Sequence, residues 1–114
     1  MTSRRRGTVL LAGAAGAFLM VLGTSAVADA ATIRTYPVAP DIRLNVRSGP
    51  GTTYGIVRVL PVNTRVPIFC QTPGTTVTGY YGTSNIWDNI DIGEYVSDTY
   101  VQTGSDGYVA DRCG

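Results

Sequence analysis

The sequence contains no histidine and no lysine, and beyond residue 30 it also contains no methionine. A serine or cysteine nucleophile needs a general base, and the usual base is an imidazole. The absence of histidine therefore argues against the common nucleophilic hydrolases, and two cysteines without histidine make a poor zinc site. We expect a protein that is not an enzyme and that holds neither a metal nor another cofactor.

An excess of charge of either sign is also missing. The nine basic residues are all arginine, and they face eight acidic residues. Without the first thirty residues, six arginines and seven acidic residues remain, which leaves a net charge of −1. Nucleic-acid-binding domains usually show a basic excess, and anionic lipid attracts basic segments. We therefore expect neither nucleic acid nor a membrane surface as a partner of the mature chain.

Long apolar runs are confined to the N-terminus. Three arginines at 4–6 precede an apolar run at 8–23, and an A-x-A site ends at Ala30. This pattern is typical of a cleaved signal peptide over residues 1–30, and the run is short for a membrane anchor. We expect cleavage after Ala30, with Ala28 as the competing site. The protein is then secreted, by the general secretory or the twin-arginine route.

Only two cysteines are present, Cys70 and Cys113. An exported protein with two cysteines most often pairs them, whereas a metal-binding or nucleophilic pair is the alternative. A domain this small buries little core and often needs a covalent staple. We predict a Cys70–Cys113 disulfide, which chain-entropy reasoning makes worth about 4 kcal/mol.

The mature chain is rich in Val, Ile, Thr and Tyr, and glycine or proline interrupts it every few residues. This composition is typical of a small all-β barrel, and helical periodicity is absent. We expect an extended lead-in at 31–40 and a long Thr-, Gly- and Tyr-rich loop at 71–84. Strands are predicted at 42–47, 56–60, 65–71, 85–90, 94–96 and 107–110.

The clearest pattern is a strand that runs into a sharp turn. Apolar and polar residues alternate over 42–47, which indicates a strand with one buried face. Gly49, Pro50 and Gly51 follow, and these residues serve the geometry of a tight turn. A strand, this turn, a Tyr54-Gly hinge and a second strand together resemble the opening of the bacterial SH3-like (SH3b) domain family.

The resemblance extends over residues 41–101. Residues 56–66 look like the family's second strand, turn and third strand, and 86–90 resembles its tryptophan-bearing strand. Residues 94–101 resemble the closing segment, with tyrosine and glutamate in place of the usual tryptophan and glycine. The resemblance implies a small SH3-like barrel. Residues 102–114 extend beyond it, as a C-terminal strap tied back by the disulfide.

Members of this family are usually extracellular and usually bind cell-wall material. The resemblance therefore implies a secreted, non-catalytic binding module that recognises peptidoglycan, through its stem or cross-bridge peptides. We expect a monomer, and an exposed edge strand leaves a dimer as the alternative. The alternative is a secreted protein–protein interaction module, such as an inhibitor or signalling partner of an extracellular protein. The protein is then either free in the medium or associated with the cell wall.

The predicted ligand groove is lined by Arg47, Tyr54, Tyr80, Tyr81 and Trp87. Arginine binds carboxylates in a bidentate manner, and aromatic faces stack on sugar rings or peptide planes. Each residue also has a structural interpretation. Arg47 could brace the turn through a salt bridge, and Tyr54 could cover the barrel end; for these two residues we favour the structural role. Trp87 could pack against the tail, and one tyrosine of the adjacent pair could anchor its loop.

Four carboxylates lie close together in the sequence: Asp88, Asp91, Glu94 and Asp98. Two carboxylates across a groove can hydrolyse a glycosidic bond, but so small a domain leaves no room for a deep sugar cleft. The spacing also differs from that of a calcium loop. We expect these side chains at a solvated surface, or paired with arginines such as Arg47 and Arg58.

Overall fold

The computed structural model describes residues 33–114, so the predicted signal peptide and its cleavage site lie outside the described residues. The described residues form an all-β domain, which confirms the predicted fold class. In chain order the elements are β2 (Thr35–Pro37), β3 (Leu44–Arg47), β4 (Ile56–Leu60), β5 (Arg65–Pro67), β6 (Cys70–Gly79), β7 (Gly82–Asp91), β8 (Glu94–Ser97) and the 3-10 turn η2 (Asp98–Tyr100). No helix among residues 33–114 has the length and hydropathy to cross a membrane.

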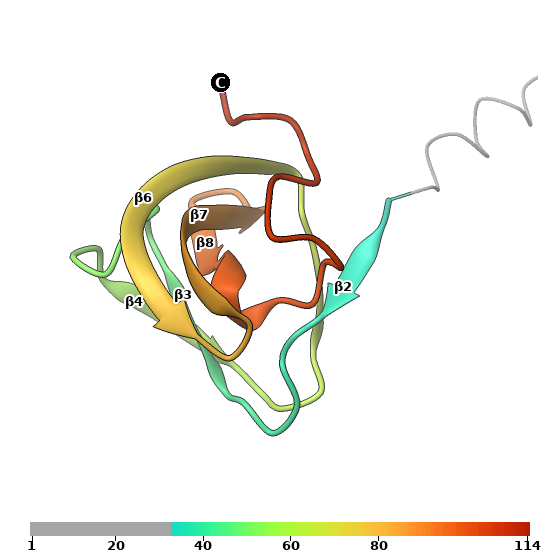
Figure 1. Ribbon diagram of the computed structural model, residues 1–114. Helices are drawn as coiled ribbons and strands as arrows, with labels where there is room; N and C mark the ends of the chain where they lie inside the picture. The colour runs from blue at the N-terminus through green and yellow to red at the C-terminus, as the bar shows by residue number, and fades with distance from the viewer. Residues whose placement is uncertain (1–32) are drawn as a thin grey trace, which may run out of the picture. The chain divides into compact units, whose positions relative to one another are not determined.

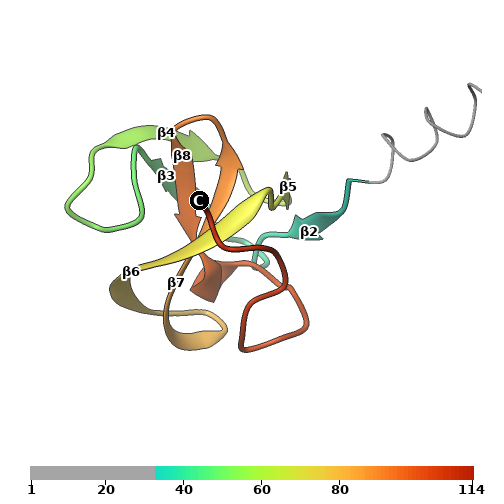
Figure 2. The ribbon, with the colours of Figure 1, turned by 90° about the horizontal axis from the view of Figure 1, so that it is seen from above.

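The strands form two antiparallel sheets. Five strands follow the order β4-β3-β8-β7-β6, and β2 pairs with β5 in a second, two-stranded sheet. Figure 1 shows β6 and β7 as long, curved strands, and Figure 2 shows the C-terminal segment beside β6. The strong curvature follows from the right-handed twist of antiparallel strands and from a break in the β6–β7 register between Pro73 and Val77.

The core forms where alternating apolar side chains of several strands meet. In β3, Leu44 and Val46 are buried while Asn45 is exposed, as the alternation predicts. Removing such side chains from water is the main force that holds a small domain together. The buried cluster comprises Val38, Leu44, Val46, Leu60, Val66, Ile90, Val96 and Val101.

The segment 31–40, expected as a lead-in, contributes to the fold. Its residues Thr35–Pro37 form β2, and Val38 and Ala39 are buried. The backbone N–H of Val38 donates to the carbonyl of Thr64 at 3.0 Å, and that of Ala39 donates to Tyr100 at 2.8 Å. These contacts tie the start of the domain to its closing segment.

The prediction of a long loop at 71–84 is wrong. This segment is a hairpin in which β6 and β7 are joined at Tyr80 and Tyr81. Threonine and valine favour extended backbone, and Thr78 and Thr83 form a cross-strand hydroxyl pair at 2.8 Å. Many Thr and Gly residues suggested a loop, but pairing between the two arms decided the structure.

The C-terminal strap carries no strand at 107–110, so that prediction is also wrong. One isolated β-bridge, Gln71 with Arg112, pairs the strap with β6. The predicted disulfide is formed: Cys70 and Cys113 are joined with their Cα atoms 4.9 Å apart. The strap is therefore irregular chain that is fastened to the start of β6.

Candidate functional site

Arg47 braces the turn that follows β3. Its Nη1 donates to the carbonyl oxygens of Thr52 at 3.1 Å and Tyr54 at 2.9 Å. The brace uses backbone carbonyls and not the salt bridge considered from the sequence. Gly49 lies directly against the ring of Tyr54, so that a Cβ at this position would come within 2.5 Å of the ring. Tyr54 therefore packs on its own turn, with 47% of its surface exposed.

Trp87 is almost fully buried, with 2% of its surface exposed. Its Nε1 donates to the carbonyl of Thr75 at 2.8 Å, across the irregular part of the β6–β7 pairing. A Cβ on Gly74 would come within 2.9 Å of the ring, so the chain passes close to the indole there. The side chain thus packs within the hairpin and offers only an edge to the surface.

The edge of Trp87 forms part of a cavity of about 370 Å³. Three side chains at alternate positions line this cavity: Asn45 and Arg47 on β3, and Arg43 directly before β3. Ser97 and Tyr100 line it from the end of β8 and from η2. No acidic residue lines it. We call this cavity the arginine groove.

The adjacent tyrosines lie at the tip of the β6–β7 hairpin. Their ring centroids are 4.8 Å apart in an edge-to-face arrangement, and Tyr80 and Tyr81 are 56% and 39% exposed. Neither lines the arginine groove. The structure therefore brings Arg47 and Trp87 to one cavity, places Tyr81 at another, and leaves Tyr54 and Tyr80 outside both.

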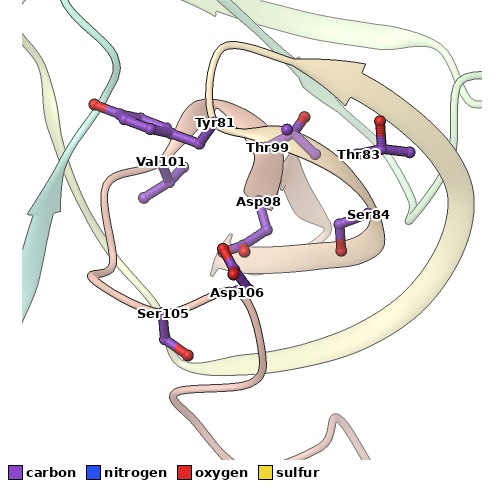
Figure 3. A pocket seen from close by; sticks show the side chains of 9 residues that line it. Tyr81, Thr83, Ser84, Asp98, Thr99, Val101, Ser105 and Asp106 are labelled. Carbon is purple, nitrogen blue, oxygen red and sulfur yellow. The ribbon is translucent and has the colours of Figure 1, made fainter.

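The second cavity has a volume of about 360 Å³ and opposite chemistry (Figure 3). Tyr81 stands at one end, and the carboxylates of Asp98 and Asp106 line it from η2 and from the strap. No basic residue lines it. Its hydroxyl side chains are Thr83, Ser84, Thr99 and Ser105. We call this cavity the hydroxyl groove.

Asp98, which lines the hydroxyl groove, is paired with a second buried carboxyl group, that of Asp88. Asp88 is fully buried and Asp98 is 6% exposed. Gln71, also fully buried, donates from Nε2 to Asp88 Oδ1 at 2.7 Å and to Asp98 Oδ1 at 3.4 Å. The expectation that these two carboxylates are solvated or paired with arginine is therefore wrong. Gln71 on β6, Asp88 on β7 and Asp98 on η2 meet there.

Burial, followed by the hydrogen bond and the negative charge of Asp98, raises the pKa of Asp88 to about 9. The hydrogen bond from Gln71 opposes this shift. Burial also raises the pKa of Asp98, whereas its hydrogen bond with Asp88 lowers it. Asp88 Oδ2 has no protein donor, as expected for an oxygen that carries a proton and faces a second carboxylate. At neutral pH Asp88 therefore holds a proton and donates it to Asp98.

Gln71 also fastens the strap. Its Oε1 accepts hydrogen bonds from the backbone N–H groups of Val109 at 2.7 Å and Ala110 at 2.9 Å. Its own N–H donates to Asp111 O at 2.8 Å, and Cys113 N donates to Gln71 O at 2.9 Å. Sequence reasoning missed this residue because a lone glutamine carries no signature. Its position directly after a bridged cysteine was the available clue.

The other two carboxylates of the acidic run behave as expected. Glu94 Oε1 accepts from Arg58 Nη2 at 2.8 Å and from Arg58 Nε at 3.0 Å. Asp91 is exposed, and its Oδ1 accepts from the N–H of Ile92 at 2.7 Å. Over residues 33–114 no group of three or more His, Cys, Asp or Glu residues is arranged to hold a metal ion.

Comparison with known proteins places this chain beside two proteins of Bacillus subtilis (strain 168), both described as uncharacterized. It is 52% identical to YraI over 90 residues, which cover 72% of this chain and 73% of YraI. It is 54% identical to YraJ over 91 residues, which cover 72% of this chain and 74% of YraJ. No family model matches the sequence. The chain belongs to the family of YraI and YraJ.

Proposed function

We propose that this domain is a secreted, non-catalytic module that binds carboxylate-bearing peptides, and that its ligand is the stem or cross-bridge peptide of cell-wall peptidoglycan. The observation that carries the proposal is the arginine groove. It presents two guanidinium groups and an amide on one face of β3, and no acidic residue lines it.

The spacing of the two arginines suits an extended peptide. Arg43, Asn45 and Arg47 occupy alternate positions, and the Cα atoms of the two arginines are about 13 Å apart in an extended chain. An extended ligand of similar length could place a carboxylate at each end and a backbone amide at Asn45. Guanidinium groups bind carboxylates through paired, charge-assisted hydrogen bonds.

The side chains of Arg43 and Arg47 differ in how firmly the protein holds them before a ligand binds. Arg47 is held by two carbonyls through Nη1, and within residues 33–114 its Nε and Nη2 have no protein partner. Arg43 is exposed and forms no ion pair within the same residues. A guanidinium fixed in advance loses less side-chain entropy when it binds. We therefore assign the anchoring contact to Arg47 and an adjustable contact to Arg43.

Pelleting with insoluble peptidoglycan, with and without its attached polymers, tests the proposal. We expect saturable pelleting of the oxidised protein, and Arg43→Ala should weaken it about ten- to hundredfold, because a lost charge-assisted hydrogen bond costs about 1.5–3 kcal/mol. Arg34→Ala is the matched control, since it removes the same charge from an exposed residue outside the groove. Equal losses in both variants would indicate unspecific attraction and contradict the proposal.

A soluble stem peptide provides the sharper measurement. Titration with the free-acid peptide should shift the backbone amide signals of residues 43–47. The same peptide with amidated carboxyl groups should bind much more weakly, because the proposed recognition is of carboxylate. Equal binding of both peptides would disprove carboxylate recognition.

A second candidate function rests on β4, which forms one edge of the five-stranded sheet. Ile56, Val57 and Val59 are between 42% and 51% exposed along this edge. An apolar edge strand can pair with an extended strand of another extracellular protein. If this is the function, a protein partner purified from the medium should no longer bind the Val57→Asp variant. The same partner should still bind the Arg43→Ala variant.

A further inference from the structure

The hydroxyl groove has the features of a site for a polyhydroxylated ligand. We propose that the hydroxyl groove, together with the cavity that adjoins it, binds a linear carbohydrate of two or more sugar rings. This site goes beyond the proposed peptide function, and it uses none of the residues of the arginine groove.

The shape of the hydroxyl groove suits an extended ligand. A neighbouring cavity of about 260 Å³ shares four lining residues with the hydroxyl groove: Tyr81, Val101, Ser105 and Asp106. The two cavities therefore continue into each other along the strap. The larger one alone, at about 360 Å³, lies within the size range of small-ligand sites. A continuous pair of cavities suits a chain of rings better than one compact ligand.

The hydrogen-bonding groups of the hydroxyl groove match those of a sugar. Sugar hydroxyl groups both donate and accept, and the groove offers hydroxyl groups that do the same, together with carboxylates that accept. Asp98 is nearly buried and is held from behind by Gln71, so its position is defined before a ligand arrives. Asp106 is exposed on the strap, and both carboxyl groups point into the cavity (Figure 3).

Tyr81 gives the site an aromatic wall. Tyr81 lines both cavities. Its backbone N–H donates to Thr99 O at 2.8 Å, and the ring of Tyr80 packs against it. A fixed and partly exposed aromatic face provides a stacking surface for the apolar face of a sugar ring. Peptide carboxylates, by contrast, are repelled by the two acidic side chains.

Two kinds of glycan could present these hydroxyl groups, and two oligosaccharide probes distinguish them. An N-acetylated glucosamine tetramer presents hydroxyl and amide groups, and its deacetylated form adds ammonium groups. Each is titrated into the oxidised protein while the backbone amide signals are followed by NMR. We expect the N-acetylated tetramer to shift the signals of Tyr81, Thr99, Ser105 and Asp106. Tighter binding of the deacetylated form would show that the natural ligand is an amino glycan.

Variants separate this site from the peptide groove. Tyr81→Ala should weaken glycan binding about tenfold, the loss of roughly 1.4 kcal/mol of stacking, while Tyr81→Phe should bind within a factor of about two. Arg43→Ala should leave glycan binding unchanged. If the protein binds glycan but no stem peptide, the proposed function is refuted and this inference stands. If it binds stem peptide but no glycan, this inference is refuted and the proposed function stands.

Three outcomes overturn the inference. The first is the absence of shifts at the groove up to the solubility limit of both tetramers. The second is shifts confined to residues outside the two cavities. The third is binding of the deacetylated tetramer alone, matched by a simple alkylamine, which would make the groove a cation site. Unchanged amide spectra of the free variants ensure that a loss of binding is not a loss of fold.

Discussion

The arginine groove and the hydroxyl groove have nearly the same volume and opposite charge. One is lined by two arginines and no acid, and the other by two aspartates and no base. Consecutive residues of a single short segment supply both grooves. Ser97 and Tyr100 line the first, whereas Asp98 and Thr99 line the second. Side-chain direction in this segment of four residues therefore separates two kinds of binding chemistry.

The two grooves also differ in how their walls are held. Strands β3, β6, β7 and β8 all contribute to the arginine groove, and backbone ladders join these strands. One wall of the hydroxyl groove is the irregular strap, which carries Ser105 and Asp106. The strap depends on the disulfide and on Gln71. Removing the disulfide or the Gln71 contacts should therefore disturb the hydroxyl groove before the arginine groove.

Removal of the disulfide should have the largest effect. The cysteines are 43 residues apart, and chain-entropy reasoning gives a loss of about 4 kcal/mol in the free energy of unfolding for Cys70→Ser with Cys113→Ser. Denaturant unfolding measures this loss. At low temperature, where the domain stays folded, amide signals around Ser105 and Asp106 should change while those of 43–47 remain. Equal changes in both regions would contradict the difference between the grooves.

Replacement of Gln71 should have the next largest effect. Gln71→Leu leaves the N–H groups of Val109 and Ala110 without an acceptor and removes a donor from Asp88. Because buried polar groups without partners cost about 1–3 kcal/mol each, we expect a loss of about 3 kcal/mol in denaturant unfolding. Gln102→Leu, at an exposed position of the strap, is the matched control and should change stability little.

The third prediction concerns pH. In the unfolded chain Asp88 ionises near pH 4, whereas in the folded domain its pKa is about 9. Between these values the folded state binds the extra proton, so the free energy of unfolding falls as pH rises. The stabilisation is complete below about pH 4 and is lost as pH rises through about 9, with a slope of at most about 1.4 kcal/mol per pH unit.

Asp88→Asn tests this assignment, because an amide can accept from Gln71 and donate to Asp98 without titrating. Thermal melts between pH 4 and 9 should then lose most of their slope. Asp41→Asn, at an exposed turn, should retain the slope of the original protein. An unchanged slope in Asp88→Asn would show that another group carries the pH dependence.

Local patterns predicted part of the fold well. The alternation around Leu44 and Val46 gave the buried face of β3, because strand periodicity is a property of neighbouring residues. The pairing of Cys70 with Cys113 followed from there being only two cysteines. The ion pair of Glu94 with Arg58 agreed with the expectation that the acidic run includes carboxylates paired with arginine.

The errors share one physical cause. The arms of the β6–β7 hairpin and the buried pair of Asp88 and Asp98 depend on contacts between residues far apart in the sequence. An aspartate is normally solvated, so sequence reasoning places it at the surface unless its partners are known. Tyr81 was predicted to bind a ligand, but only the hairpin shows that it shares a cavity with Asp98 and not with Arg47.

The sequence by itself determined that the domain is all-β, where its first buried strand lies, and that its two cysteines join. Each of these follows from composition or from neighbouring residues. Only the tertiary structure decided that the acidic run is split between the core and the surface, and that basic and acidic side chains face different cavities. Burial and proximity set those outcomes, and both are properties of the whole fold.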